Sequence, residues 1–361
     1  MTERQAHIAF NLTERVGSAT LSKLSATAGS AVAAWESYPD KVARSGGEVD
    51  WKGEERRAAN YRIDILTALD KGYPARLREA PGAPLALYVK GDVAALSKPA
   101  IAMIGTRRAT SYGLAVAEKL AFDLAKAGWT VVSGLAVGID AAAHRGALAA
   151  GGVTVGVIGS GLDRFYPDEN RELAREMVKS GGAVVSEFPF GRPADQTTFP
   201  IRNHVVAALV AGVVAVECPA RSGTLITTSF AADLGRTVMA VPARIDSRMS
   251  AGCLSLIRDG ATLVRNADDV IEAVGGLALS DKKGGCAASC ARDPETPAYG
   301  ADEALVMTHV DEAGVSVDEL VRLTGLPVEQ VNAVVMGLRI KGFVKFLPGN
   351  RISLLTSVRR F

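Results

Sequence analysis

Seven short runs of apolar, mostly β-branched residues between positions 85 and 274 constrain the fold of this chain most strongly. Each run is continuous rather than alternating, which is typical of strands buried on both faces. The segments between runs, such as 114–127, 169–179 and 224–234, have the length of crossover helices. The pattern predicts an α/β fold with a doubly wound, Rossmann-like parallel sheet. The runs are 101–104, 130–132, 153–158, 183–185, 213–216, 237–241 and 262–264.

Two smaller units are predicted on either side of this sheet. Residues 1–75 carry leucine and valine at helical spacings, which predicts a small helical domain. Gly17 within it fits a helix-hairpin-helix turn, but we favour a plain packed helix pair. Residues 276–300 lack apolar periodicity and have the composition of a linker. Residues 301–361 show three helical segments and a hairpin around Pro348, the layout of a winged helix. The sheet domain is therefore expected to span residues 76–275.

Five loops of the predicted sheet carry residue types that bind anions. Ligands of doubly wound sheets lie beyond the carboxyl ends of the strands. There, free amides at helix starts and arginine side chains bind phosphate, and an aromatic ring beside an arginine suits a nucleotide. One such loop would be ordinary helix capping, but the convergence of several on one edge predicts a phosphate or nucleotide site. The candidates are Gly105, Thr106, Arg107, Ser133, Gly134, Gly138, Gly161, Arg164, Phe199, Arg202, Asn203, Ser222, Gly223 and Thr224.

Several familiar catalytic and cofactor sites are excluded by the residues present. The chain has no G-x-x-x-x-G-K-[ST] loop, and Gly159-Ser160-Gly161 lacks the third glycine of a dinucleotide fingerprint. The four histidines are scattered, and Cys286 and Cys290 lack a second ligand pair, so neither a metal nor a cofactor is expected. Asp140 and His144 share a helical face, and we interpret them as a structural pair because no nucleophile adjoins them.

Charge and cysteine content limit the class of protein. With 41 Lys and Arg against 39 Asp and Glu, the net charge is +2, so nucleic acid must be bound by local patches. Residues 331–361 hold six arginines and lysines and no carboxylate, which suits DNA phosphates or an ordinary solvated face equally well. Four cysteines, the absence of a signal-peptide pattern and the absence of a long apolar stretch predict a cytoplasmic protein without a membrane span.

Seven motifs follow one another along the predicted sheet domain. They are G-T-R-x-A-T-x-Y-G at 105–113, S-G-L-A-x-G-I-D-x3-H at 133–144, G-L-D-x2-Y-P at 161–167, S-E at 186–187, F-P-x-R-N at 199–203, S-G-T-L-I-T at 222–227 and A-V-P at 240–242. In this order they resemble the DNA-processing protein A (DprA/Smf) family. The resemblance covers about residues 85–272, and the flanking units match the family in position and size.

The resemblance implies a protein that acts by binding and not by catalysis. It implies that the sheet domain binds single-stranded DNA, that the protein protects incoming strands in natural transformation and helps to load the RecA recombinase, and that it forms a homodimer. It implies that Arg107 and Arg202 bind phosphates and that Phe199 and Asn203 lie near a base. It also implies that Ser133, Gly134, Gly161, Ser222 and Gly223 line the pocket.

Three positions depart from the family pattern. His204 stands where the family has arginine, Ala243 where it has glycine, and Leu254 where it has asparagine. Because His204 replaces a permanent cation, we expect weaker or more pH-dependent DNA binding.

Two other functions remain open. The fragment Ser222-Gly223-Thr224 also resembles the phosphate turn of Rossmann-like nucleotide-phosphate hydrolases. Alternatively, the winged helix serves chiefly to dock a protein partner.

Overall fold

The computed structural model describes residues 1–13, 16–38, 43, 47–278, 301–310, 315–328, 330–331, 334–335, 338, 344–347 and 351–354. The chain divides into two compact units, Met1–Lys283 and Gly284–Phe361. The finer division into helical domain, sheet domain, linker and winged helix stays a prediction.

A nine-stranded sheet in the order β1-β2-β6-β5-β4-β3-β7-β8-β9 forms the core of the first unit. Strands β3 to β9 pair in parallel, which confirms the predicted doubly wound sheet. The chain winds from β3 to β6 on one side and from β7 to β9 on the other. The direction therefore reverses between β3 and β7, where ligands of such sheets bind. The strands are β1 (Asp64–Leu66), β2 (Leu87–Gly91), β3 (Ala100–Gly105), β4 (Thr130–Ser133), β5 (Thr154–Val157), β6 (Ala183–Ser186), β7 (Gly212–Glu217), β8 (Thr237–Ala240) and β9 (Thr262–Leu263).

Helices cover both faces of the sheet, because its central strands are apolar on both sides. Along β3, Ile101 and Met103 pack in one cluster with α6 and α7, whereas Ala102 and Ile104 pack in another with α9. The helices of this unit are α1 (Glu3–Leu12), α2 (Ser18–Ala28), α3 (Ala31–Ser37), α4 (Trp51–Tyr61), α5 (Ala75–Glu79), α6 (Ser111–Lys126), α7 (Ile139–Ala149), α8 (Arg171–Lys179), α9 (Thr198–Leu209), α10 (Gly223–Asp233), α11 (Ala251–Arg258) and α12 (Ala267–Ala278), with 3-10 turns η1 (Val93–Ser97) and η2 (Asp168–Asn170).

Strands β1 and β2 are additions that the apolar pattern did not predict. They extend the sheet antiparallel beyond β6, and β1 lies within the segment expected to be helical. In β1 only Ile65 is buried, opposite Tyr88 of β2. A strand of three residues is too short to leave a readable periodicity.

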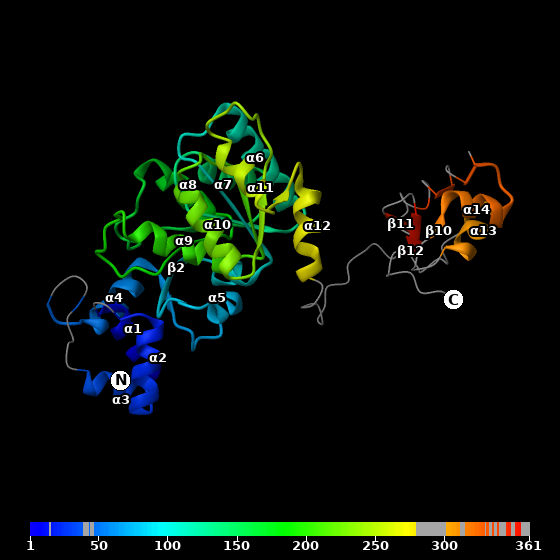
Figure 1. Ribbon diagram of the computed structural model, residues 1–361. Helices are drawn as coiled ribbons and strands as arrows, with labels where there is room; N and C mark the ends of the chain where they lie inside the picture. The colour runs from blue at the N-terminus through cyan, green and yellow to red at the C-terminus, as the bar shows by residue number, and fades with distance from the viewer. Residues whose placement is uncertain are drawn as a thin grey trace. The chain divides into compact units, whose positions relative to one another are not determined.

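A buried carboxyl group joins the N-terminal helices to this edge of the sheet. Glu54 of α4 accepts hydrogen bonds at Oε1 from the Tyr88 hydroxyl (2.8 Å) and from the Phe190 amide (2.9 Å). Burial raises the pKa of Glu54, and these two bonds oppose that shift. In Figure 1, α1 to α4 gather at one end of the unit.

The second unit contains α13 (Ala301–His309), α14 (Val317–Thr324), β10 (Val315–Ser316), β11 (Val344–Leu347) and β12 (Arg351–Leu354). Its sheet has the order β10-β12-β11, and the residues described between 328 and 338 are helical. Val306, Leu320, Val335 and Ile352 are among the residues of its core. This is the predicted winged-helix layout.

Two expectations fall mostly outside the described residues. The hairpin tip at 348–350 is one, and the linker from residue 279 onward is the other, since α12 continues to Ala278. Among the residues that the structure describes, no helix is long and apolar enough to span a membrane.

Candidate functional site

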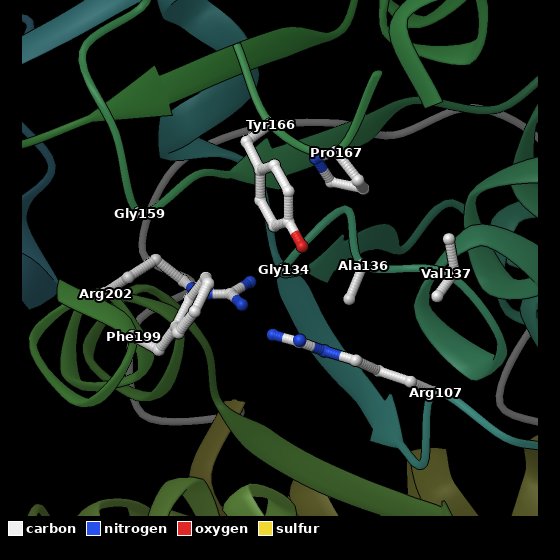
Figure 2. Close-up of a pocket in the computed structure, with 9 residues that line it drawn as sticks. All are labelled: Arg107, Gly134, Ala136, Val137, Gly159, Tyr166, Pro167, Phe199 and Arg202. Atoms are coloured by element: carbon white, nitrogen blue, oxygen red, sulfur yellow. The ribbon is translucent and has the colours of Figure 1, made fainter. Parts of the chain in front are cut away.

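An open cavity of about 390 Å³ lies at the carboxyl ends of β3 and β7, where the sheet reverses direction. A smaller recess, lined in part by Gly159 and Tyr166, shares several of its walls (Figure 2). Of the residues predicted for the site, the larger cavity is lined by Gly105, Thr106, Arg107, Gly134, Phe199, Arg202, Asn203, Ser222, Gly223 and Thr224.

Two arginines converge in the cavity from different elements. Arg107 is exposed on the loop after β3, whereas Arg202 of α9 is only 6% exposed. Figure 2 shows their guanidinium groups pointing toward one another, with the hydroxyl of Tyr166 directed to the same space. Burial lowers the pKa of Arg202, and the charge of Arg107 lowers it further, while Asp140 opposes both. Two cations held this close favour an anion between them.

The absence of a side chain at Gly134 makes room for Arg202. A Cβ atom at position 134 would lie 1.4 Å from Nη1 of Arg202. The same Nη1 donates to the carbonyl of Val157 (3.1 Å). The Nε of Arg202 is buried and has no hydrogen-bond partner among the described residues.

Asp140 and His144 have structural roles, but they are not the pair that we expected. Asp140 accepts from the amides of Gly134 (3.1 Å) and Ala136 (3.4 Å), and burial raises its pKa. The Nδ1 of His144 lies 2.6 Å from the hydroxyl of Thr154, which itself donates to the carbonyl of Val131 (2.7 Å). Burial lowers the pKa of His144 to about 3. Each side chain therefore stabilises a separate set of backbone and strand contacts.

Phe199 lies between a cation and a second aromatic ring. The Arg107 guanidinium carbon is 4.8 Å from its ring centroid, within cation–π range. The ring of Tyr166, 47% exposed, lies 6.2 Å from it at an interplanar angle of 45°. Asn203 of the same helix donates from Nδ2 to the carbonyl of Gly223 (3.4 Å), which joins α9 to the start of α10.

The side chain of Glu217 lies at the start of α6, where the sequence predicts free amides that bind an anion. Its side chain accepts from both the amide and the hydroxyl of Thr110, each at 2.8 Å. The Thr110 hydroxyl in turn caps the amide of Gly113 (3.1 Å). The amides of Thr110 and Gly113 are thus already bonded within the protein, and phosphate binding by the other amides of this loop stays a prediction. Two arginines of this loop, Arg107 and Arg108, line the cavity.

Four of the predicted site residues do not line the cavity. Ser133 is buried and donates to the carbonyl of Met103 (2.5 Å), joining β4 to β3. A Cβ atom at Gly138 would lie 2.5 Å from the Thr106 carbonyl oxygen, and one at Gly161 2.4 Å from that of Pro189, so both shape loops. Arg164 is exposed on the loop after β5, outside the cavity.

His204 is also placed differently from our expectation. Its ring packs edge-on against Phe230, 5.4 Å away, and burial lowers its pKa. It is not among the residues that line the cavity, and weaker or more pH-dependent DNA binding through His204 stays a prediction. Conversely, Arg108 and Arg221 line the cavity without having been singled out. The sequence could have indicated both arginines, because Arg108 follows the motif residue Arg107 and Arg221 precedes the motif residue Ser222.

Comparisons with known proteins agree on one family. The family model described as DNA recombination-mediator protein A matches residues 64–275, and the DprA winged helix domain matches residues 291–350. Protein Smf of Synechocystis sp. is 32% identical over 326 residues, covering 82% of this chain and 81% of the relative. DNA processing protein DprA of Streptococcus pneumoniae is 41% identical over 210 residues, covering 58% of this chain and 74% of the relative.

Two solved structures are similar to this fold. The X-ray structure of DNA processing protein A from Streptococcus pneumoniae has a TM-score of 0.62 at 30% identity, covering 75% of this chain and 98% of that one. DNA processing protein A from Helicobacter pylori, whose structure concerns its single-stranded DNA binding mode, has a TM-score of 0.52 at 28% identity. That match covers 61% of this chain and 97% of the other.

Proposed function

The chain belongs to the DNA recombination-mediator protein A (DprA/Smf) family, and from this premise we propose that its cavity binds single-stranded DNA without catalysing a reaction. The cellular roles follow as part of the same proposal: protection of incoming DNA in natural transformation, loading of the RecA recombinase, and action as a cytoplasmic homodimer. Family membership supports these roles, and the cavity supports the binding.

The convergence of Arg107 and Arg202 beside Phe199 is the observation that carries the proposal. A phosphodiester between the two guanidinium groups relieves their mutual repulsion and accepts charge-assisted hydrogen bonds. An unpaired base then stacks near Phe199 and Tyr166, since every base offers a π face to an aromatic ring. Duplex DNA keeps its bases stacked inside the helix, so single strands are preferred.

Fluorescence anisotropy of a labelled oligonucleotide, single-stranded and duplex, tests this proposal across a salt series. We expect tight single-strand binding whose salt slope falls by about 0.7 for each phosphate contact removed. Arg107→Ala and Arg202→Ala should each flatten the slope. Arg164→Ala is the matched control, because this arginine is exposed outside the cavity. Equal slopes in all four proteins would contradict the proposal.

The hydrolase alternative is supported by Ser222, Gly223 and Thr224, which line the cavity. However, the hydroxyl of Ser222 caps α10 by accepting from the Thr224 amide (3.2 Å). Asp140 is the carboxyl group among the lining residues described, and it is bonded to two amides. We therefore expect no base release from adenosine monophosphate, and measured release above a no-protein control would favour the hydrolase.

The docking alternative concerns the second unit. If the winged helix serves only to bind a partner, deleting residues after Ala301 should abolish function in cells and leave single-strand affinity intact. A large loss of single-strand affinity on this deletion would instead place part of the DNA site in the second unit.

A further inference from the structure

Charge is unevenly distributed along the carboxyl edge of the sheet. The loops and turn that follow β5 and β6 carry five carboxylates and two arginines: Asp163, Asp168, Glu169, Glu187, Asp195, Arg164 and Arg192. The loops that follow β3, β7 and β8 carry five arginines and one carboxylate: Arg107, Arg108, Arg221, Arg244, Arg248 and Asp246. The loop after β4, residues 134–138, is uncharged and separates the two halves.

The positive half is continuous with the cavity. Strands β3, β7 and β8 are neighbours, so their loops lie side by side. Arg107, Arg108 and Arg221 line the cavity itself. At the start of α6, the hydroxyl of Tyr112 donates to the carbonyl of Pro242 (3.4 Å), which ties the loop after β8 to the same edge. The two strand spacings from β3 to β8 measure roughly 10 Å, about the length of three stacked nucleotides.

The arginines of the loops after β7 and β8 are exposed, and two of the three form no ion pair among the described residues. Arg221 and Arg248 form no ion pair within the described parts of the chain, whereas Arg244 pairs with Asp246 (2.7 Å). Two apolar side chains stand among them in solvent: Ile245 is 93% exposed and Tyr112 is 53% exposed. Isolated cations with exposed apolar and aromatic groups between them are what a polyanion with unpaired bases would contact.

We propose that a single strand filling the cavity continues over the ends of β7 and β8, with its phosphates on Arg221, Arg244 and Arg248 and its bases against Ile245 and Tyr112. This inference rests on the proposed function and adds the path of the strand. The opposite path over β5 and β6 would bring phosphates toward five carboxylates, whose repulsion disfavours it. The charge distribution thus selects one direction out of the cavity.

Two matched double variants test the path with single strands of roughly 4 and roughly 16 nucleotides, the span of site sizes seen for OB-fold domains. The first double variant combines Arg244→Ala with Arg248→Ala, and the second combines Arg192→Ala with Arg164→Ala. In each, the first arginine pairs with a nearby aspartate and the other forms no ion pair among the described residues. For the long strand, the first pair should lower the salt slope by about 1.4, or 0.7 for each contact. The short strand should bind the first double variant as it binds the parent, and the second double variant should match the parent at both lengths.

Asp246→Asn supplies a gain-of-affinity test that does not depend on removing a cation. It releases Arg244 from its ion pair, so long strands should bind more tightly and with a steeper salt slope, while short strands are unaffected. If both Asp246→Asn and the first double variant bind long strands as the parent does, the proposed path of the strand is wrong, while the proposed function stands. Equal losses for short and long strands in the first double variant would overturn the proposed path too. Failure of the parent to bind either strand would overturn the proposed function together with it.

Discussion

At the scale of single residues, the absence of a side chain at Gly134 determines where the guanidinium group of Arg202 lies in the cavity. Gly134 leaves the space into which Arg202 extends from α9, and the carbonyl of Val157 holds that guanidinium in place. Arg202 is buried, so its position is set by packing and not by solvent. A small change at Gly134 is therefore expected to act on DNA binding through Arg202.

Gly134→Ala tests this dependence. The new methyl group would collide with Nη1 of Arg202, so we expect a loss of stability of about 1–3 kcal/mol and a flatter salt dependence of single-strand binding. Thermal unfolding and anisotropy measure the two effects. Gly275→Ala is the control, because a Cβ atom there meets nothing within 4 Å and the residue lies in α12, outside the cavity lining. Parent-like binding by Gly134→Ala would show that Arg202 does not depend on this space.

His144 makes stability depend on pH. Its pKa falls from 6.5 to about 3 on folding, so the unfolded chain binds the proton more readily and stability is lost as pH drops below 6.5. Between pH 6.5 and about pH 5 this amounts to about 2 kcal/mol. His144→Gln keeps a donor for Thr154 but does not titrate, so denaturant unfolding should show a smaller acid loss. Parallel pH profiles for parent and variant would contradict this assignment.

Sequence motifs identify the right loops but not the orientation of each side chain. Ser133 and Gly134 are adjacent in one motif, yet the first bonds to β3 within the core and the second opens into the cavity. Similarly, His204 follows Arg202 and Asn203 on α9 but packs against Phe230. A helix turns about 100° per residue, so neighbours in a motif face different surroundings.

At the scale of elements, continuous apolar runs predicted the parallel strands because both faces of such strands are buried. The runs gave no sign of β1 and β2, which are short and lie at the edge, nor of the bond between Glu217 and Thr110. That bond joins residues 107 positions apart in the chain. Contacts of this kind depend on the completed sheet and leave no local pattern in the sequence.

The substitution Glu217→Gln tests whether the contact between Glu217 and Thr110 stabilises the start of α6. A neutral amide replaces the carboxylate, so the Thr110 hydroxyl has to accept from the amide N–H instead of donating, and both charge-assisted bonds are lost. We expect a loss of about 1–3 kcal/mol in the free energy of unfolding. Glu118→Gln is the control, since the side chain of Glu118 is exposed on α6. If the two variants are equally stable, Glu217 does not anchor the start of α6.

At the scale of the whole molecule, the first unit contains the sheet and the complete cavity. A chain ending at Lys283 should therefore unfold cooperatively and bind single strands within about twofold of the parent, a difference of roughly 0.4 kcal/mol. The basic residues between 331 and 361 are lost in this truncation. Calorimetry and anisotropy on the truncated chain check both expectations, and a broad, non-cooperative transition would show that the first unit needs the second.

The carboxyl group of Glu217 bears on how the protein distinguishes a polymer from a metabolite. An unoccupied helix start at this position would attract free phosphate and mononucleotides, which would then compete with DNA. Here the protein supplies its own acidic group to that helix start. The remaining cations are spaced along the edge of the sheet, so a single phosphate engages few of them and a chain of phosphates engages many at once. Small anions are thus expected to be weak competitors, and the protein gains selectivity for length.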